Sequence, residues 1–147
     1  MGHVSVFWAT LAGCTGFAML QGGMPERGIA TIFLLGAAAS AAALRPLGER
    51  YQGVEVGVFL VDVTMFVGLA GIALRSRRYW PQWIVAMQML EVASHFSRLL
   101  PDVIRLAYGV ILSFWAYPML LVLVAGTARH RIRVARGQDE GSWAPRG

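Results

Sequence analysis

The sequence predicts an all-α protein, an integral membrane bundle of five helices. Three observations predict this fold class. Hydrophobic residues make up 56% of the 147-residue chain and charged residues only 14%, and mean hydropathy is +0.56. Apolar runs close to the roughly 20 residues that cross a bilayer follow one another with short polar breaks. That length leaves room for about five such helices and none for a separate catalytic domain.

The first two spans are predicted from uncharged runs that end at helix breakers. Residues 4–20 carry no formal charge and stop before Gly22, Gly23 and Pro25. No basic segment or small-residue cleavage site marks them as a removable leader, so an uncleaved span is expected. The second span, residues 28–44, is rich in Ala and Gly and ends at Arg45 and Pro46.

Three further spans follow at residues 54–74, 83–100 and 104–127. The fourth is the least apolar, and the fifth contains Pro118, which a helix among neighbours tolerates. The bundle as a whole is predicted over residues 1–136. Residues 137–147 are expected to form a disordered C-terminal tail.

The arginines predict the orientation of the five spans. Cytoplasmic loops collect basic residues, and five crossings put most of the arginines on one side of the membrane. We therefore expect a multi-pass protein of a bacterial inner membrane, with its N-terminus outside and its C-terminus in the cytoplasm. Nine of the thirteen arginines then lie on the cytoplasmic side: Arg27, Arg75, Arg77, Arg78, Arg129, Arg131, Arg133, Arg136 and Arg146.

Aromatic and basic residues at the expected cytoplasmic boundary predict contact with lipid. Trp80 and Trp83 lie where the fourth helix begins, as interface anchors do, and Pro81 suits a first helical turn. The basic cluster after the fifth span suits anionic headgroups. Membrane lipids are thus expected partners and nucleic acid is not, because no basic face of a soluble fold is predicted.

Ionisable residues inside two neighbouring spans form the main candidate site. Gln88, Glu91, His95 and Arg98 are spaced three, four and three residues apart, which places them on one helix face. Glu55 and Asp62, seven residues apart, share a face of the preceding span. Charges in the apolar layer are costly unless paired.

An antiparallel arrangement about a turn at Arg77 and Arg78 predicts which of these residues meet. Asp62 is expected to pair with His95, and Glu55 with Arg98. Glu91 is left near Thr64, and Gln88 deeper toward the cytoplasm.

The role of this intramembrane set is open at the level of sequence. Its ion pairs fix helix register and orientation in one interpretation. Alternatives are a proton or ion path through Asp62, Glu91 and His95, a metal site on the same three residues, and a bound quinone, lipid or pigment. No metal or other cofactor is predicted. Haem lacks a second axial ligand, because His3 and His130 lie near opposite ends of the chain.

Small residues recur at four-residue spacing, in the pairs Ala9 with Gly13 and Ala12 with Gly16, in Gly53 with Gly57, and in the run over residues 36–43. Such surfaces let helices approach closely. They predict either packing of the first and second spans onto the third, or a docking face for another membrane subunit.

No nucleotide loop, hydrolase elbow or zinc-protease helix occurs, so the chain is not expected to be an enzyme. The leading interpretation is an accessory or structural subunit that docks on a larger, energy-converting membrane complex, with a membrane protein or a second copy of the chain as partner. The alternative is a proton- or ion-coupled transporter or channel component that uses the Asp/Glu/His network.

Four short motifs carry a resemblance. They are Pro25-Glu26-Arg27, the stretch from Arg78 to Trp83, the mid-helix His95, and the stretch from Gly126 to His130. On these motifs the chain resembles small, uncharacterised multi-span inner-membrane proteins of alphaproteobacteria. The resemblance implies helical architecture and membrane location, and it assigns no functional residue.

Overall fold

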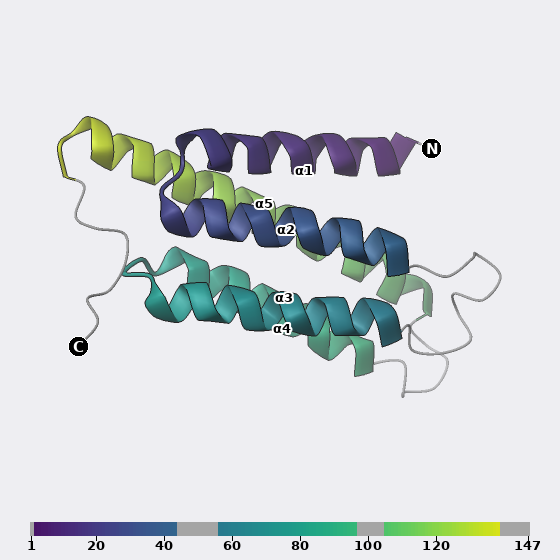
Figure 1. Cartoon of the computed structure of the whole chain (residues 1–147). Helices are drawn as coiled ribbons and strands as arrows, with labels where there is room; N and C mark the ends of the chain where they lie inside the picture. Colours follow the sequence, from purple (N-terminus) through teal and green to yellow (C-terminus); the bar gives the residue numbers. More distant parts are fainter. Residues whose placement is uncertain (1, 44–55, 97–104, 139–147) are drawn as a thin grey trace.

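The computed structural model describes residues 2–43, 56–96 and 105–138, which form α-helices joined by turns (Figure 1). The all-α prediction is confirmed. Within the described residues there are five helices, in chain order: α1 Gly2–Gln21, α2 Met24–Ala43, α3 Val56–Arg75, α4 Trp80–Ser94 and α5 Arg105–Ala135.

The helices form a closed bundle in which each packs against the next along the chain. Helix α5 also packs against α1, which closes the ring, and it touches α2 as well. The α1–α2 turn, the α3–α4 turn and the C-terminal part of α5 lie at one end of the bundle, opposite the N-terminus (Figure 1). We call this end the turn end.

Helix α2 begins earlier than predicted. Its first residue is Met24, and Pro25 and Glu26 lie in its first turn. Proline is accepted there because the N–H it lacks has no partner inside the helix. A side chain at Gly22 would lie 2.5 Å from the Cβ of Glu26, so glycine allows this tight connection from α1.

Helix α4 also begins earlier, at Trp80, with Pro81 in its first turn as the sequence indicated. It ends at Ser94 and not at the predicted boundary of residue 100. The hydroxyl of Ser94 donates to the carbonyl of Glu91, a local bond that competes with helical pairing. Residues 95–96 add a short 3-10 turn.

Helix α5 is longer than the predicted span, which ended at residue 127. No helix breaker follows Thr127 until Gly137, so Arg129, Arg131 and Arg133 are helical. Gly137 has a φ of 66°, and the N–H groups of Gly137 and Gln138 donate to carbonyls of the last helical turn, a glycine-based helix cap. The predicted disordered tail therefore begins with an ordered cap, and residues 139–147 lie outside the described residues.

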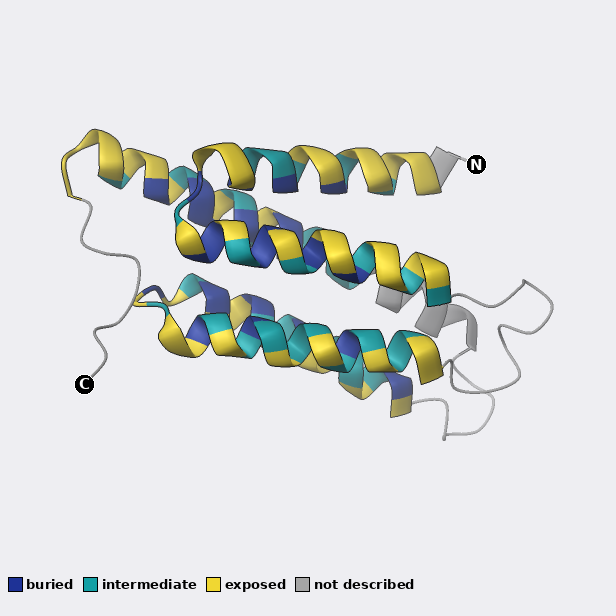
Figure 2. Cartoon of the chain, viewed as in Figure 1, coloured by how far each residue is buried: buried dark blue, intermediate teal, exposed yellow. Residues whose placement is uncertain are grey.

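Burial differs from that of a water-soluble bundle. Large apolar side chains are exposed on all five helices, among them Leu20, Leu35, Leu74, Met89 and Leu121 (Figure 2). The interior combines an apolar core, which includes Ile29, Leu69, Ile84 and Leu123, with buried polar side chains. In the described part of the chain these are Thr15, Glu26, Asp62, Arg78, Gln88, His95, Thr127 and His130. Extensive apolar exposure together with buried ionisable residues is typical of proteins whose surroundings are lipid.

Among the described residues, three helices are long and apolar enough to cross a membrane: Val4–Gln21 within α1, Met24–Ala43 and Val56–Arg75. Together with the apolar exterior, they favour a membrane protein.

Small residues hold α2 close to α3. Side chains added at Gly28 and Gly36 of α2 would collide with Ile72 and Met65 of α3, so the two backbones approach as they do at small-residue helix interfaces. The predicted packing of the second span on the third is therefore confirmed at Gly36. The first span packs instead on α2 and α5, so its predicted packing on the third span was wrong. Gly53 lies outside the described residues.

Candidate functional site

A buried acid–imidazole pair lies between α3 and the C-terminal end of α4, where His95 is the residue after the last helical one. Nε2 of His95 lies 2.7 Å from Oδ2 of Asp62, and the two side chains are 5% and 9% exposed. The pairing of these residues predicted from the antiparallel turn is confirmed.

Neighbouring side chains fix this pair in place. The ring of Phe59 meets the imidazole edge-on, with 5.5 Å between ring centroids. Gln88, which is fully buried, donates from Nε2 to the backbone carbonyl of Asp62 at 3.4 Å. Gln88 thus contacts the residue that carries the site.

The rest of the predicted network is only partly described. Glu91 is half-buried. Thr64 is exposed, and its hydroxyl donates to the carbonyl of Leu60. Glu55 and Arg98 lie outside the described residues, so their pairing stays a prediction.

A metal site at these residues is not supported. Among the described residues, no three His, Cys, Asp or Glu side chains come together in a group that could hold a metal ion.

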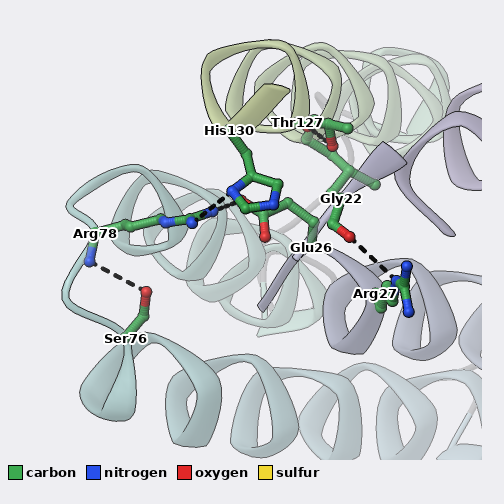
Figure 3. A network of polar contacts seen from close by, with 8 residues as sticks. Gly22, Glu26, Arg27, Ser76, Arg78, Thr127 and His130 are labelled. Carbon is green, nitrogen blue, oxygen red and sulfur yellow. Dashed lines mark hydrogen bonds and ion pairs between the residues drawn. The ribbon is translucent and has the colours of Figure 1, made fainter. Parts of the chain in front are cut away.

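A second buried cluster, which the sequence did not predict, lies at the turn end (Figure 3). Glu26 of α2, Arg78 of the α3–α4 turn and His130 of α5 meet there, and we call them the turn-end cluster. Nη1 of Arg78 forms an ion pair with Oε1 of Glu26, and Nη2 lies 2.8 Å from Nδ1 of His130. One guanidinium therefore joins three segments that are far apart in the sequence.

The chemistry of arginine sets the protonation of His130. A guanidinium has hydrogen-bond donors and no acceptor, so Nδ1 of His130 must accept from Arg78. The imidazole is then neutral and carries its proton on Nε2. A proton on Nδ1 would set two cationic groups against each other in a site where Arg78 is 9% exposed and His130 8% exposed.

Local structure explains why these side chains meet. Glu26 lies in the first turn of α2, where the partial positive charge of the helix N-terminus favours a carboxylate. The N–H of Arg78 donates to the hydroxyl of Ser76 at 3.1 Å, which orders the α3–α4 turn. Nε of Arg27 donates to the carbonyl of Gly22 at 3.1 Å, which closes the α1–α2 turn.

Two glycines let the cluster close. A side chain at Gly23 would lie 3.2 Å from both Oε2 of Glu26 and Nε2 of His130. A side chain at Gly126 would lie 2.5 Å from the ring of Trp80. Trp80, predicted as an interface anchor, instead packs its ring on α5. Trp83 is 66% exposed, as an anchor would be.

The sequence grouped Arg78 with Arg75 and Arg77 as a topology-setting charge and did not predict its burial. Arg78 is buried, whereas Arg75 and Arg77 are exposed. It pairs with Glu26, and this pairing is favourable because an unpaired carboxylate would be costly at a site with no exposure. Arg129 and Arg131 are exposed and Arg133 is half-buried.

Sequence reasoning missed Glu26 and His130. A signal was available in the order of the helices. Because successive helices run in alternating directions, the α1–α2 turn, the α3–α4 turn and the C-terminal end of α5 lie at the same end of the bundle. Glu26 is the acidic residue that follows the α1–α2 turn. Three of the four motifs quoted above, residues 25–27, 78–83 and 126–130, meet at the turn-end cluster.

Comparison of the chain with protein-family models, with curated proteins and with solved structures finds no match.

Proposed function

We propose that the chain is a five-span protein of a bacterial inner membrane, with its N-terminus outside and the turn end in the cytoplasm. The alternation of the helices, which separates the N-terminus from the end of α5, supports this arrangement (Figure 1). So does the positive-inside rule, since the arginines of both short turns and of the end of α5 gather at the turn end.

Its function in this proposal is that of a non-enzymatic accessory or structural subunit, which docks on a larger membrane complex through α1. One observation carries the assignment. Nothing lies within 4 Å of the positions where Gly13 and Gly16 would carry side chains, and Ala9, Ala12 and Gly13 are exposed. Gly28 and Gly36 of α2, by contrast, face Ile72 and Met65 of α3.

The occupant that fits this face is a transmembrane helix of another subunit. Its surroundings in the proposal are lipid, so small residues that allow close backbone contact, and not a hydrophobic driving force, would hold the two helices together.

Co-purification in mild detergent tests the proposal. We expect the tagged chain to bring down a stoichiometric membrane subunit, and Gly13→Leu to lose it because the larger side chain blocks close approach. Gly71→Leu is the matched control, since Gly71 of α3 is also exposed with nothing within 4 Å. Solitary migration of the unaltered chain would contradict the proposal. A complex containing only this chain would identify the occupant as a second copy.

A second candidate is a component of a proton- or ion-coupled transporter or channel. The contact between Asp62 and His95 favours it, because ionisable residues inside membrane-spanning segments are typical of proton and ion pathways. Asp62→Asn with His95→Gln separates the candidates. A conducting role predicts loss of ion flux in reconstituted vesicles with assembly intact, whereas a structural role predicts an assembled but less stable bundle.

A further inference from the structure

The turn end carries far more positive than negative charge. Its described residues include eight arginines and one carboxylate, that of Glu26. Glu26 is fully buried and is paired with Arg78. The remaining charges form a basic surface with no ion pair to a carboxylate among the described residues. Its exposed members are Arg27, Arg75, Arg77, Arg129, Arg131 and Arg136.

The turn-end cluster explains why this basic surface combines residues from segments that are distant in sequence. Because Arg78 contacts His130, the residues beside them in the chain are brought to the same region. Arg77 of the α3–α4 turn and Arg129 and Arg131 of α5 therefore lie at the same end of the bundle. These three guanidinium groups come from segments that are distant in sequence.

Helix α5 reaches through the layer where lipid headgroups lie. Its 31 residues correspond to about 46 Å at 1.5 Å per residue, whereas the hydrocarbon core is about 30 Å thick and the whole bilayer about 40–45 Å. Beside the arginines near its end, Ile132 and Val134 are 50% and 49% exposed. Apolar side chains among basic ones are typical of a helix segment at the boundary between headgroups and acyl chains.

We propose that the basic surface of the turn end is a binding site for anionic phospholipid headgroups. The inference rests on the proposed membrane insertion and adds a lipid class to it. Charge complementarity supports this partner, since guanidinium groups bind phosphate through paired hydrogen bonds. Insertion in the proposed orientation holds these arginines at the level of the anionic headgroups, so the lipid meets the site at high local concentration.

The test compares two lipids in reconstituted vesicles of the full chain. Vesicles of phosphatidylcholine with a minor fraction of phosphatidylglycerol are prepared with bromine on one lipid or on the other, and quenching of tryptophan fluorescence is measured. Trp83 is exposed at the turn end, and a Trp83→Phe variant measured in parallel separates its signal from that of the other four tryptophans. We expect bromine on phosphatidylglycerol to quench more than its share of the bilayer accounts for, and high salt to reduce this preference.

Variants locate the site. Arg129→Gln with Arg131→Gln is expected to lower the preference for phosphatidylglycerol by roughly fivefold for each arginine removed. Both side chains are exposed, so the fold should persist. Arg105→Gln, at the opposite end of α5, is the matched control and should keep the preference.

Each contrary outcome has a distinct meaning. Quenching in simple proportion to lipid content would overturn the lipid site while leaving membrane insertion intact, and would assign the arginines to another acidic partner. A preference that survives in the double variant would also overturn it. A chain that does not enter the vesicles, and is quenched by neither lipid, would overturn the proposed membrane location itself.

Discussion

At the scale of single residues, the most consequential side chain is Arg78. It pairs with Glu26 and donates to His130, so it links α2, the α3–α4 turn and α5. Buried ion pairs of this kind add little stability compared with well-packed apolar residues, but breaking one leaves a charge without compensation. We therefore expect the free energy of unfolding to fall more when one member of the ion pair is replaced than when both are replaced by apolar residues.

Glu26→Ala tests this sensitivity. Removing the carboxylate leaves Arg78 buried without its counter-charge, and we expect the free energy of unfolding in mixed micelles to fall by about 3–5 kcal/mol. Arg77→Gln, at an exposed neighbour, should change it by less than about 0.5 kcal/mol. Glu26→Leu with Arg78→Leu should lose less than Glu26→Ala. An equal loss in all three variants would show that the pair is not what makes this site sensitive.

The neutral imidazole of His130 gives a second prediction. His130→Asn places an amide oxygen where Nδ1 accepts from Arg78, whereas His130→Lys places a cation there. We expect the lysine variant to be less stable than the asparagine variant by about 2 kcal/mol or more, because like charges are then buried together. Thermal unfolding in detergent measures the order. A lysine variant as stable as the asparagine one would refute the assigned protonation.

At the scale of helices, close approach governs how α5 and α4 are joined. The ring of Trp80 lies where Gly126 has no side chain, and Thr127 next to it is fully buried. Together with Arg78 and His130, this contact ties the start of α4 to the last turns of α5. We therefore expect the contact between α4 and α5 to be lost in the same unfolding step as the contacts of the turn-end cluster.

Gly126→Ala measures that contact. The added methyl group would meet the indole ring, and we expect a loss of about 1–3 kcal/mol in the free energy of unfolding from overpacking. Gly71→Ala is the control, because its side chain meets nothing within 4 Å and alanine favours helix by up to about 1 kcal/mol. If both variants gained stability, the indole ring would not be packed on Gly126.

Some contacts and boundaries of the helices could be predicted from the sequence, and others could not. The pairing of Asp62 with His95 was predictable because α3 and α4 are joined by a short turn, which fixes their register. The helical state of Arg129–Arg133 was not predicted, because charge was taken as the end of the apolar span, whereas the helix continues until Gly137 can adopt its positive φ. The turn-end cluster depends on contacts between α2, the α3–α4 turn and α5, and no local pattern specifies such distant contacts.

At the scale of the whole molecule, two buried polar clusters lie inside an apolar shell. The Asp62–His95 pair joins α3 to the C-terminal end of α4, and the turn-end cluster joins three segments at the turn end. In both clusters, ionisable side chains find polar partners that the acyl chains of lipids could not provide. This arrangement agrees with the helical bundle predicted from composition, and it gives the molecule a defined polar end.

The proposed orientation requires the polar turn end to lie on the cytoplasmic side of the membrane, and reporter fusions measure this directly. A fluorescent protein that folds only in the cytoplasm, or a phosphatase active only outside it, is fused after Gln138, where α5 and its cap are complete. We predict fluorescence from the first fusion and no activity from the second. An active phosphatase fusion together with a non-fluorescent protein fusion would place the turn end outside the cytoplasm and contradict the proposed orientation.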